Sequence, residues 1–204
     1  MPSRFPRFLT LPLAALLTGA AAAAPQIKPI QGVDVCTVTS TSGQYSVRVL
    51  NTGDKTLSHA DVLGVLLNSS GQGGKHVTVS LKDLPPGRYK TADLARHGES
   101  AALVSVATYQ MINGVDTPQY ELYAGKVAHV APGSALQYTL APLALRGWTV
   151  AYGAAQAPRL EAGSAVLLIY PARPDKKRDL TRPDAGRTPA DVVPLTACPG
   201  ARQP

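Results

Sequence analysis

Short runs of alternating apolar and polar residues, separated by turn-forming residues, recur along most of this 204-residue chain. Residues 33–39 and 45–50 alternate in this way, and Asn113-Gly114, a strong hairpin signal, separates two further runs. A period of two places every second side chain on the same face of a β-strand, whereas no segment sustains the 3.6-residue period of a helix. The pattern predicts an all-β fold, an antiparallel β-sandwich of about 9–10 strands.

Individual runs also predict which side chains face the core. Tyr45, Val47 and Val49 lie at alternate positions and are expected to share the inner face, with Arg48 pointing to solvent. Residues 90–97 are the one stretch with some helical character, and we expect a single helical turn there. The order of the strands does not follow from the pattern.

The N-terminus has the features of a secretory signal. Arg4 and Arg7 form a basic region, residues 8–17 are uncharged and apolar, and a run of small residues follows at 20–24. Because a proline directly after the cut obstructs cleavage, we expect the signal peptide to comprise residues 1–23. The alternative is an uncleaved membrane anchor, for which the apolar run is short.

The remainder is predicted to form one domain and a tail. Residues 24–170 carry the strand pattern and are long enough to bury a core. Residues 171–204, the tail, are rich in proline and arginine and are expected to be irregular or disordered. The formal charge of +7 is concentrated in the signal and the tail, so nucleic acid is not an expected partner. No second apolar segment is long enough to predict stable membrane insertion after signal cleavage.

Cys36 and Cys198 are the only two cysteines of the chain. In an exported chain such a pair predicts a disulfide, which would tie the tail back to the domain as a strap along the surface. Two free thiols or a metal site are the alternatives, although the spacing suits neither a redox motif nor a zinc knuckle. The expected location is periplasmic or extracellular.

Residues 44–90 contain a regular succession of strand and turn motifs. The run QYSVRVLNTG (44–53) ends a strand in an Asn-x-Gly turn, and Leu-Pro-Pro-Gly follows at 84–87. This segment resembles the bacterial extracellular immunoglobulin-like modules of the CARDB and fibronectin III-like kind. The resemblance implies an immunoglobulin-like adhesive or accessory sandwich without catalytic residues. The body is longer than one such module, so an elaborated single sandwich and two fused modules both fit.

Residue types that carry chemistry are spread along the chain without a recognisable motif. The histidines show no zinc-binding spacing, and no nucleophile elbow is present. We therefore expect no catalytic, metal or cofactor site, and no enzyme. The histidines are His59, His76, His97 and His129. The carboxylates considered for a hydrolase pair are Asp61, Asp93, Glu99, Asp116, Glu121 and Glu161.

The leading functional hypothesis is a non-enzymatic interaction or accessory module of the bacterial envelope, with a protein or polysaccharide partner. The first alternative is a carbohydrate-binding module, with Trp148 and Tyr152 as a possible ligand platform. Tyr120 and Tyr123 share a strand but are predicted to face opposite sides. The second alternative is an envelope hydrolase whose site is assembled across strands, which requires two close carboxylates or a histidine–carboxylate pair in a cleft.

Overall fold

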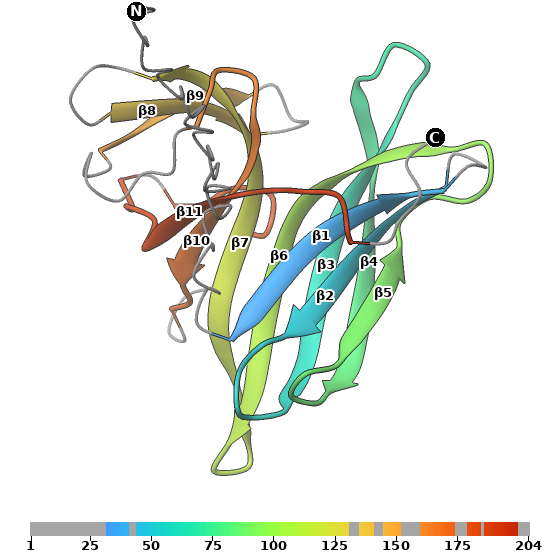
Figure 1. The fold of residues 1–204 in the computed structure, drawn as a ribbon, viewed down its shortest axis with the longest axis vertical. Coiled ribbons are helices and arrows are strands. Elements are labelled where there is room, and N and C mark those ends of the chain that lie inside the picture. Colours follow the sequence, from blue (N-terminus) through green and yellow to red (C-terminus); the bar gives the residue numbers. More distant parts are fainter. Residues whose placement is uncertain are drawn as a thin grey trace, which may run out of the picture.

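A computed structural model describes residues 32–40, 44–130, 135–140, 145–151, 160–173, 179–184 and 186–199. All regular elements in these residues are β-strands, and they form two antiparallel sheets that pack together (Figure 1). The predicted all-β sandwich is confirmed. The predicted signal peptide and the expected cleavage site lie outside the described residues.

The described part of the chain contains eleven strands, several of them longer than the sequence runs that predicted them. Among the described residues, the large apolar side chains that are exposed lie at strand ends, and they are Tyr89, Met111, Ile112 and Val115. The strands are β1 (Val33–Thr39), β2 (Tyr45–Asn51), β3 (Leu57–Leu67), β4 (Gly73–Leu84), β5 (Tyr89–Asp93), β6 (Ser100–Ile112), β7 (Val115–Val130), β8 (Ala135–Leu140), β9 (Leu145–Ala151), β10 (Ala165–Pro171) and β11 (Asp191–Pro194).

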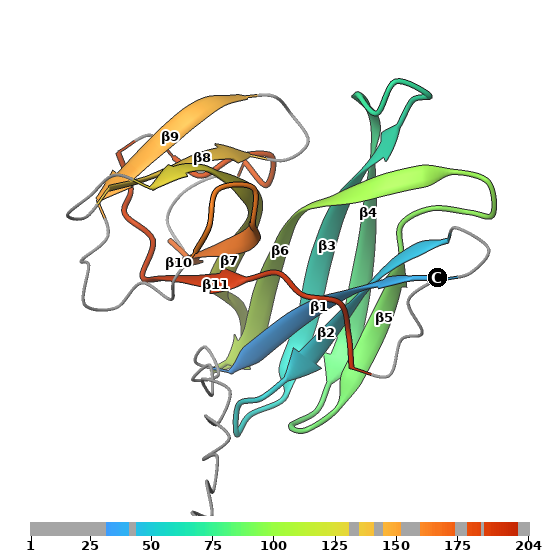
Figure 2. The same cartoon turned by 45° about the horizontal axis from the view of Figure 1, so that its top comes forward.

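The small sheet has the order β1-β2-β5, and the large sheet has the order β11-β10-β7-β6-β3-β4. Strand β7 is long enough to pair with three partners, with β6 at its start, β10 in its middle and β8 near its end. Strand β9 pairs with β8 beyond it. Figure 2 shows the small sheet lying across β3, β4 and β6, while β8 to β10 gather around the far end of β7.

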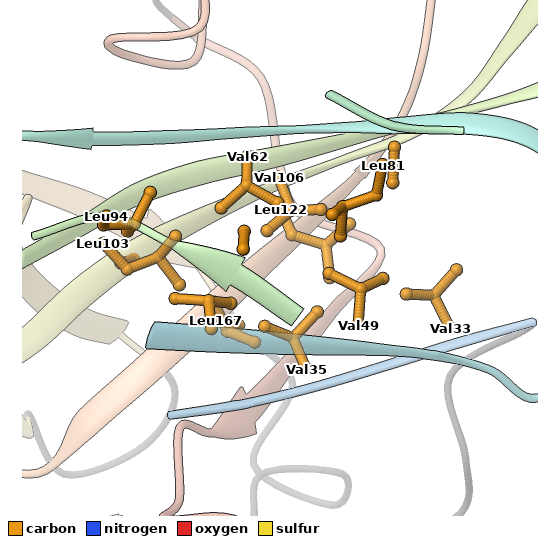
Figure 3. Close-up of a cluster of buried hydrophobic side chains, with 14 of the residues drawn as sticks. Val33, Val35, Val49, Val62, Leu81, Leu94, Leu103, Val106, Leu122 and Leu167 are labelled. Atoms are coloured by element: carbon orange, nitrogen blue, oxygen red, sulfur yellow. The ribbon is translucent and has the colours of Figure 1, made fainter. Parts of the chain in front are cut away.

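The core lies between the two sheets and is built from alternate residues of facing strands. Val47 and Val49 of β2 are fully buried, whereas Arg48 lies on the other face with its guanidinium 5.0 Å from the ring centre of Tyr89. The inner face predicted for β2 is therefore confirmed. Figure 3 shows side chains from both sheets meeting in this layer, among them Val33, Val35, Val49, Leu81, Leu94, Leu103, Val62, Val106, Leu122 and Leu167.

Asn113-Gly114 forms the predicted hairpin turn between β6 and β7. Ile112 pairs with Val115, so the loop has two residues. Both loop residues have positive φ, 52° for Asn113 and 76° for Gly114. This is the conformation that asparagine and glycine tolerate best and that matches the twist of a two-stranded ribbon.

The helical turn expected at residues 90–97 is wrong. Residues of β5 pair with β2, placing Ala92 opposite Val47 in the core. The hydroxyl of Ser46 also donates a 2.7 Å hydrogen bond to Asp93. Burial of Ala92 and pairing with a neighbouring strand outweigh the weak local preference for a helix.

The two turn motifs quoted for residues 44–90 meet at Asn51, whose side chain is fully buried. Its amide nitrogen donates to the carbonyls of Lys55 and Leu84, each at 2.8 Å. Its side-chain oxygen accepts from the backbone of Gly53 at 3.0 Å, and its own carbonyl accepts from Gly87 at 2.8 Å. Asn51 therefore satisfies polar groups of both turns and ties the end of β2 to the turn between β4 and β5.

The disulfide between Cys36 and Cys198 is confirmed, with an S–S distance of 2.02 Å. We call the described tail residues 179–184 and 186–199 the strap. Its one regular element is β11, which pairs with β10 at the edge of the large sheet, and the rest is irregular. The strap then crosses to β1, where Cys198 is bonded, so it joins an edge of each sheet (Figures 1 and 2).

Candidate functional site

The candidate site lies on the outer face of the large sheet, the face turned away from the small sheet. On β3, β6 and β7 the residues between the core positions point to this face. The strap lies over part of this face, where Leu180 packs against Leu63, Val65 and Val104. The hydroxyl of Ser105 also donates a 2.6 Å hydrogen bond to the carbonyl of Leu180. The strap is therefore packed onto the sheet.

A buried ion pair is the second anchor of the strap. Arg187 Nη1 lies 2.9 Å from Glu121 Oε2, and the two side chains are only 10% and 6% exposed. Arg187 Nη2 donates to the carbonyl of Pro171, and its guanidinium lies 5.0 Å from the ring centre of Tyr170. We call Glu121, Tyr170 and the Pro171 carbonyl the guanidinium socket. The carboxylate complements the positive charge of a guanidinium, the carboxylate and the carbonyl accept hydrogen bonds from its nitrogens, and the aromatic face packs against its flat surface.

Tyr170 of the socket is buried next to a second buried tyrosine, Tyr123. The rings of Tyr123 and Tyr170 meet edge to face, 5.8 Å apart at 77°. Tyr123 donates a hydrogen bond to the carbonyl of Asp179 at 3.1 Å, which adds a further contact with the strap. Burial and then the neighbouring Glu121 raise the pKa of Tyr123, and burial raises the pKa of Tyr170 to about 12.

Stability should fall above pH 10, because the unfolded state ionises its tyrosines near their ordinary pKa of about 10 while the folded state keeps Tyr170 neutral. The unfolded state then binds fewer protons, and each pH unit between 10 and 12 lowers the free energy of unfolding by up to about 1.4 kcal/mol for this residue. Urea denaturation at pH 9 and pH 11.5 measures the slope. The stability of Tyr170→Phe should depend less on pH than that of the wild type. An equal slope in both proteins would contradict a raised pKa of Tyr170 in the folded state.

The far end of the strap is held by backbone bonds as well as by the disulfide. Thr37 donates to the carbonyl of Thr196 at 3.0 Å, and Cys198 donates to the carbonyl of Thr37 at 2.9 Å. These bonds form a short parallel bridge along the open edge of β1. An unpaired strand edge can pair with a strand of another chain, and here the strap covers part of the β1 edge.

Another part of the outer face carries a polar cluster centred on His59. Its Nδ1 lies 3.2 Å from Asp116 Oδ2 and its Nε2 lies 3.7 Å from Asp61 Oδ2. The imidazole stacks on the ring of Tyr109 at 3.9 Å. The hydroxyl of Ser58 donates to Asp116 at 2.5 Å instead of to the imidazole, so these groups do not form a nucleophile–base–carboxylate relay.

The structure therefore brings together three groups that the sequence reasoning treated separately, His59, Asp61 and Asp116. The sequence contained one indication that two of these groups are neighbours. Residues two apart on a strand share a face, so His59 and Asp61 were neighbours by spacing alone. Asp116 is added by the pairing of β6 with β7, which the sequence does not specify.

A shallow pocket of about 430 Å³ lies beside this cluster. It is lined by carboxylates, one lysine and the side chain of Met111, which is 59% exposed. Met111, Ile112 and Val115 are exposed apolar residues at the end of the β6–β7 hairpin, which we call the hairpin tip. Ile112 pairs with Val115 and shares its face of the ribbon, whereas Met111 pairs with Asp116 on the opposite face. The lining residues of the pocket are Ser58, His59, Ser80, Lys82, Asp83, Met111 and Asp116.

The possible sugar platform lies outside the side chains that the structure describes, so it stays a prediction. The backbone of Trp148 lies in β9 opposite Tyr138, and Tyr152 lies outside the described residues. Tyr120 packs against the core between the sheets, whereas Tyr123 lies under the strap. The prediction that these two tyrosines face opposite sides is confirmed.

Two further observations bear on the kind of site. Among the described residues, no group of three or more histidine, cysteine, aspartate or glutamate side chains is placed to hold a metal ion. The same residues include no helix long and apolar enough to cross a membrane. Comparison of the chain with protein-family models, curated proteins and solved structures finds no match.

Proposed function

We propose that this chain is an exported, non-enzymatic interaction module of the bacterial envelope that binds a protein partner through the hairpin tip. Export is supported by the signal-like residues 1–23 and by the disulfide, since disulfides persist in oxidising compartments. The disulfide and the strap make the sandwich a rigid support for a binding loop.

The hairpin tip is the observation that carries the proposal. Pairing of β6 with β3 ends at Tyr109 and pairing of β7 with β10 begins at Tyr120, so the end of the hairpin extends past its neighbours as a two-stranded ribbon (Figure 1). Met111, Ile112 and Val115 on this ribbon are 59%, 44% and 63% exposed. Apolar side chains grouped on a projecting element are typical of a protein-binding surface.

The pocket beside the tip indicates the chemistry of the partner. Asp83 and Asp116 line it with Lys82, and Asp61 lies on the other side of His59, so carboxylates outnumber the one lysine. A basic side chain next to an apolar patch complements this arrangement. We propose a partner surface that places apolar residues on the tip and a lysine or arginine in the pocket.

Substitution at the tip tests the proposal. Met111→Ser/Val115→Ser should weaken binding to a purified envelope partner by about tenfold or more, because the double substitution removes an apolar side chain from each face of the tip. The partner is first captured from an envelope extract, and its affinity is then measured by titration calorimetry. Tyr89→Ser is the matched control, since Tyr89 is 58% exposed on the small sheet. Equal affinities of the tip variant and the wild type would reject the tip as the binding surface.

The histidine–carboxylate arrangement is the one feature that favours the hydrolase alternative. His59 beside Asp116 and a pocket meets the condition set for a site assembled across strands. Hydrolysis of chromogenic esters or glycosides by the wild-type chain, lost in His59→Ala, would replace the interaction module with an enzyme. Retention on polysaccharide that is lost in Trp148→Ala would instead favour the carbohydrate-binding module.

A further inference from the structure

The sheet surface beneath the strap has an apolar part, where Leu180 packs against Leu63, Val65 and Val104, and a polar part. Glu121, Tyr123 and Ser105 lie under the strap and are each no more than 4% exposed. A buried ion pair contributes little net stability compared with apolar residues of the same size, because both charges lose their hydration. The polar part of this surface therefore has the composition of a recognition interface.

The guanidinium socket is formed by the sheet itself. Glu121 of β7 and Tyr170 of β10 are directly opposite each other in the antiparallel register, and Pro171 is the next residue of β10. Their positions are fixed by strand pairing, and the strap supplies only the ligand, Arg187. A binding site whose walls are set by the scaffold persists when its occupant is removed.

The chemistry of the socket selects a guanidinium over an ammonium. The carboxylate of Glu121 accepts from one nitrogen of Arg187 and the carbonyl of Pro171 accepts from another, which a flat, forked group satisfies at once. The ring of Tyr170 lies against the same group, and a guanidinium gives up its hydration more easily than an ammonium when it contacts an aromatic face.

We propose that Glu121, Tyr170 and the Pro171 carbonyl form a binding site for an arginine side chain, and that Arg187 of the strap occupies this site as an intramolecular ligand. The site accepts other guanidinium groups once Arg187 is absent. This inference is independent of the hairpin tip, which lies on a different part of the large sheet.

Chemical rescue tests the site on the disulfide-bonded chain from residue 24 to 204. In Arg187→Ala, 10 mM methylguanidine should raise the melting temperature by about 3–6 °C, the shift expected for a ligand with a dissociation constant of about 1 mM. Methylamine, with a compact ammonium group, should give less than a third of this shift. The wild type, whose socket is filled, should not shift.

Two further variants show where the rescue acts. Glu121→Gln/Arg187→Ala should not respond to methylguanidine, because the carboxylate that receives the guanidinium is gone. Arg182→Ala is the matched control, since Arg182 also belongs to the strap but is 59% exposed and pairs with Asp179 outside the socket. It should not respond either.

The proposal is overturned if methylguanidine leaves Arg187→Ala unchanged, if methylamine acts equally well, or if the shift persists without Glu121. Should Arg187→Ala be unfolded at 25 °C, recovery of its near-ultraviolet circular dichroism on adding methylguanidine, and not methylamine, becomes the measurement. Arg187→Gln, which keeps an uncharged donor, then provides a folded protein for the same titration.

Discussion

Replacing Cys36 and Cys198 with alanine lowers the free energy of unfolding by about 3–5 kcal/mol. The disulfide spans 162 residues of sequence, so it restricts almost the whole unfolded domain, and chain entropy gives long loops the largest stabilisation. It also keeps the strap on the small sheet, where the backbone bonds at Thr37 and Cys198 and the bond from the Thr37 hydroxyl to Thr196 would remain. Because a domain of this size is stable by only about 5–15 kcal/mol, the effect is a large share of the total.

Urea denaturation at pH 7 measures this loss, with the wild type and the double alanine variant compared in the presence and absence of dithiothreitol. The variant should be insensitive to the reductant, and the reduced wild type should match it. The increase in hydrogen exchange rate over the wild type should be largest at the amides of Cys198 and Leu195, which bond the strap to the sheets. A loss below about 1 kcal/mol would contradict the view that the disulfide holds the tail in place.

Arg187→Ala lowers the free energy of unfolding by about 3 kcal/mol, because it leaves the carboxylate of Glu121 buried without its cation. Arg182→Ala should cost less than about 1 kcal/mol, because the pair that Arg182 forms with Asp179 is half exposed. The same denaturation experiment measures both variants. A similar small loss in each would show that the buried pair does not anchor the strap.

The double variant Glu121→Leu/Arg187→Leu separates the value of the pair from the cost of breaking it. Since both charges are removed together, its stability should lie within about 1 kcal/mol of the wild type. A double variant as unstable as Arg187→Ala would show that the hydrogen bond to Pro171 or the contact with Tyr170 carries the stabilisation.

The fold was predicted from features that are local in the sequence. Alternation at residues 33–39 and 45–50 marks strands because the period of two is a property of each strand alone. Asn113-Gly114 marks its turn because both residues tolerate positive φ. The disulfide followed from the count of two cysteines, which admits a single internal pairing. Strand β5 was missed because its pairing with β2, not its own composition, makes it a strand.

The candidate sites depend on contacts between distant parts of the chain, which one sequence does not encode in a readable pattern. Glu121 and Arg187 are 66 residues apart, and nothing near either residue marks its partner. Asp116 reaches His59 only through the pairing of β3 with β6 and of β6 with β7. The exposure of Met111 and Val115 follows from how far the hairpin extends beyond β3, and strand length is the least predictable feature of a strand.

Export and the disulfide that holds the strap are the central claims for this chain, and the intact mass of the protein isolated from its own cells tests both together. The protein is alkylated with iodoacetamide before and after reduction. We predict a chain that begins at Ala24, takes no alkyl group before reduction and takes two afterwards, at Cys36 and Cys198. A chain that begins at Met1 and takes two alkyl groups without reduction would contradict both export and the disulfide that holds the strap.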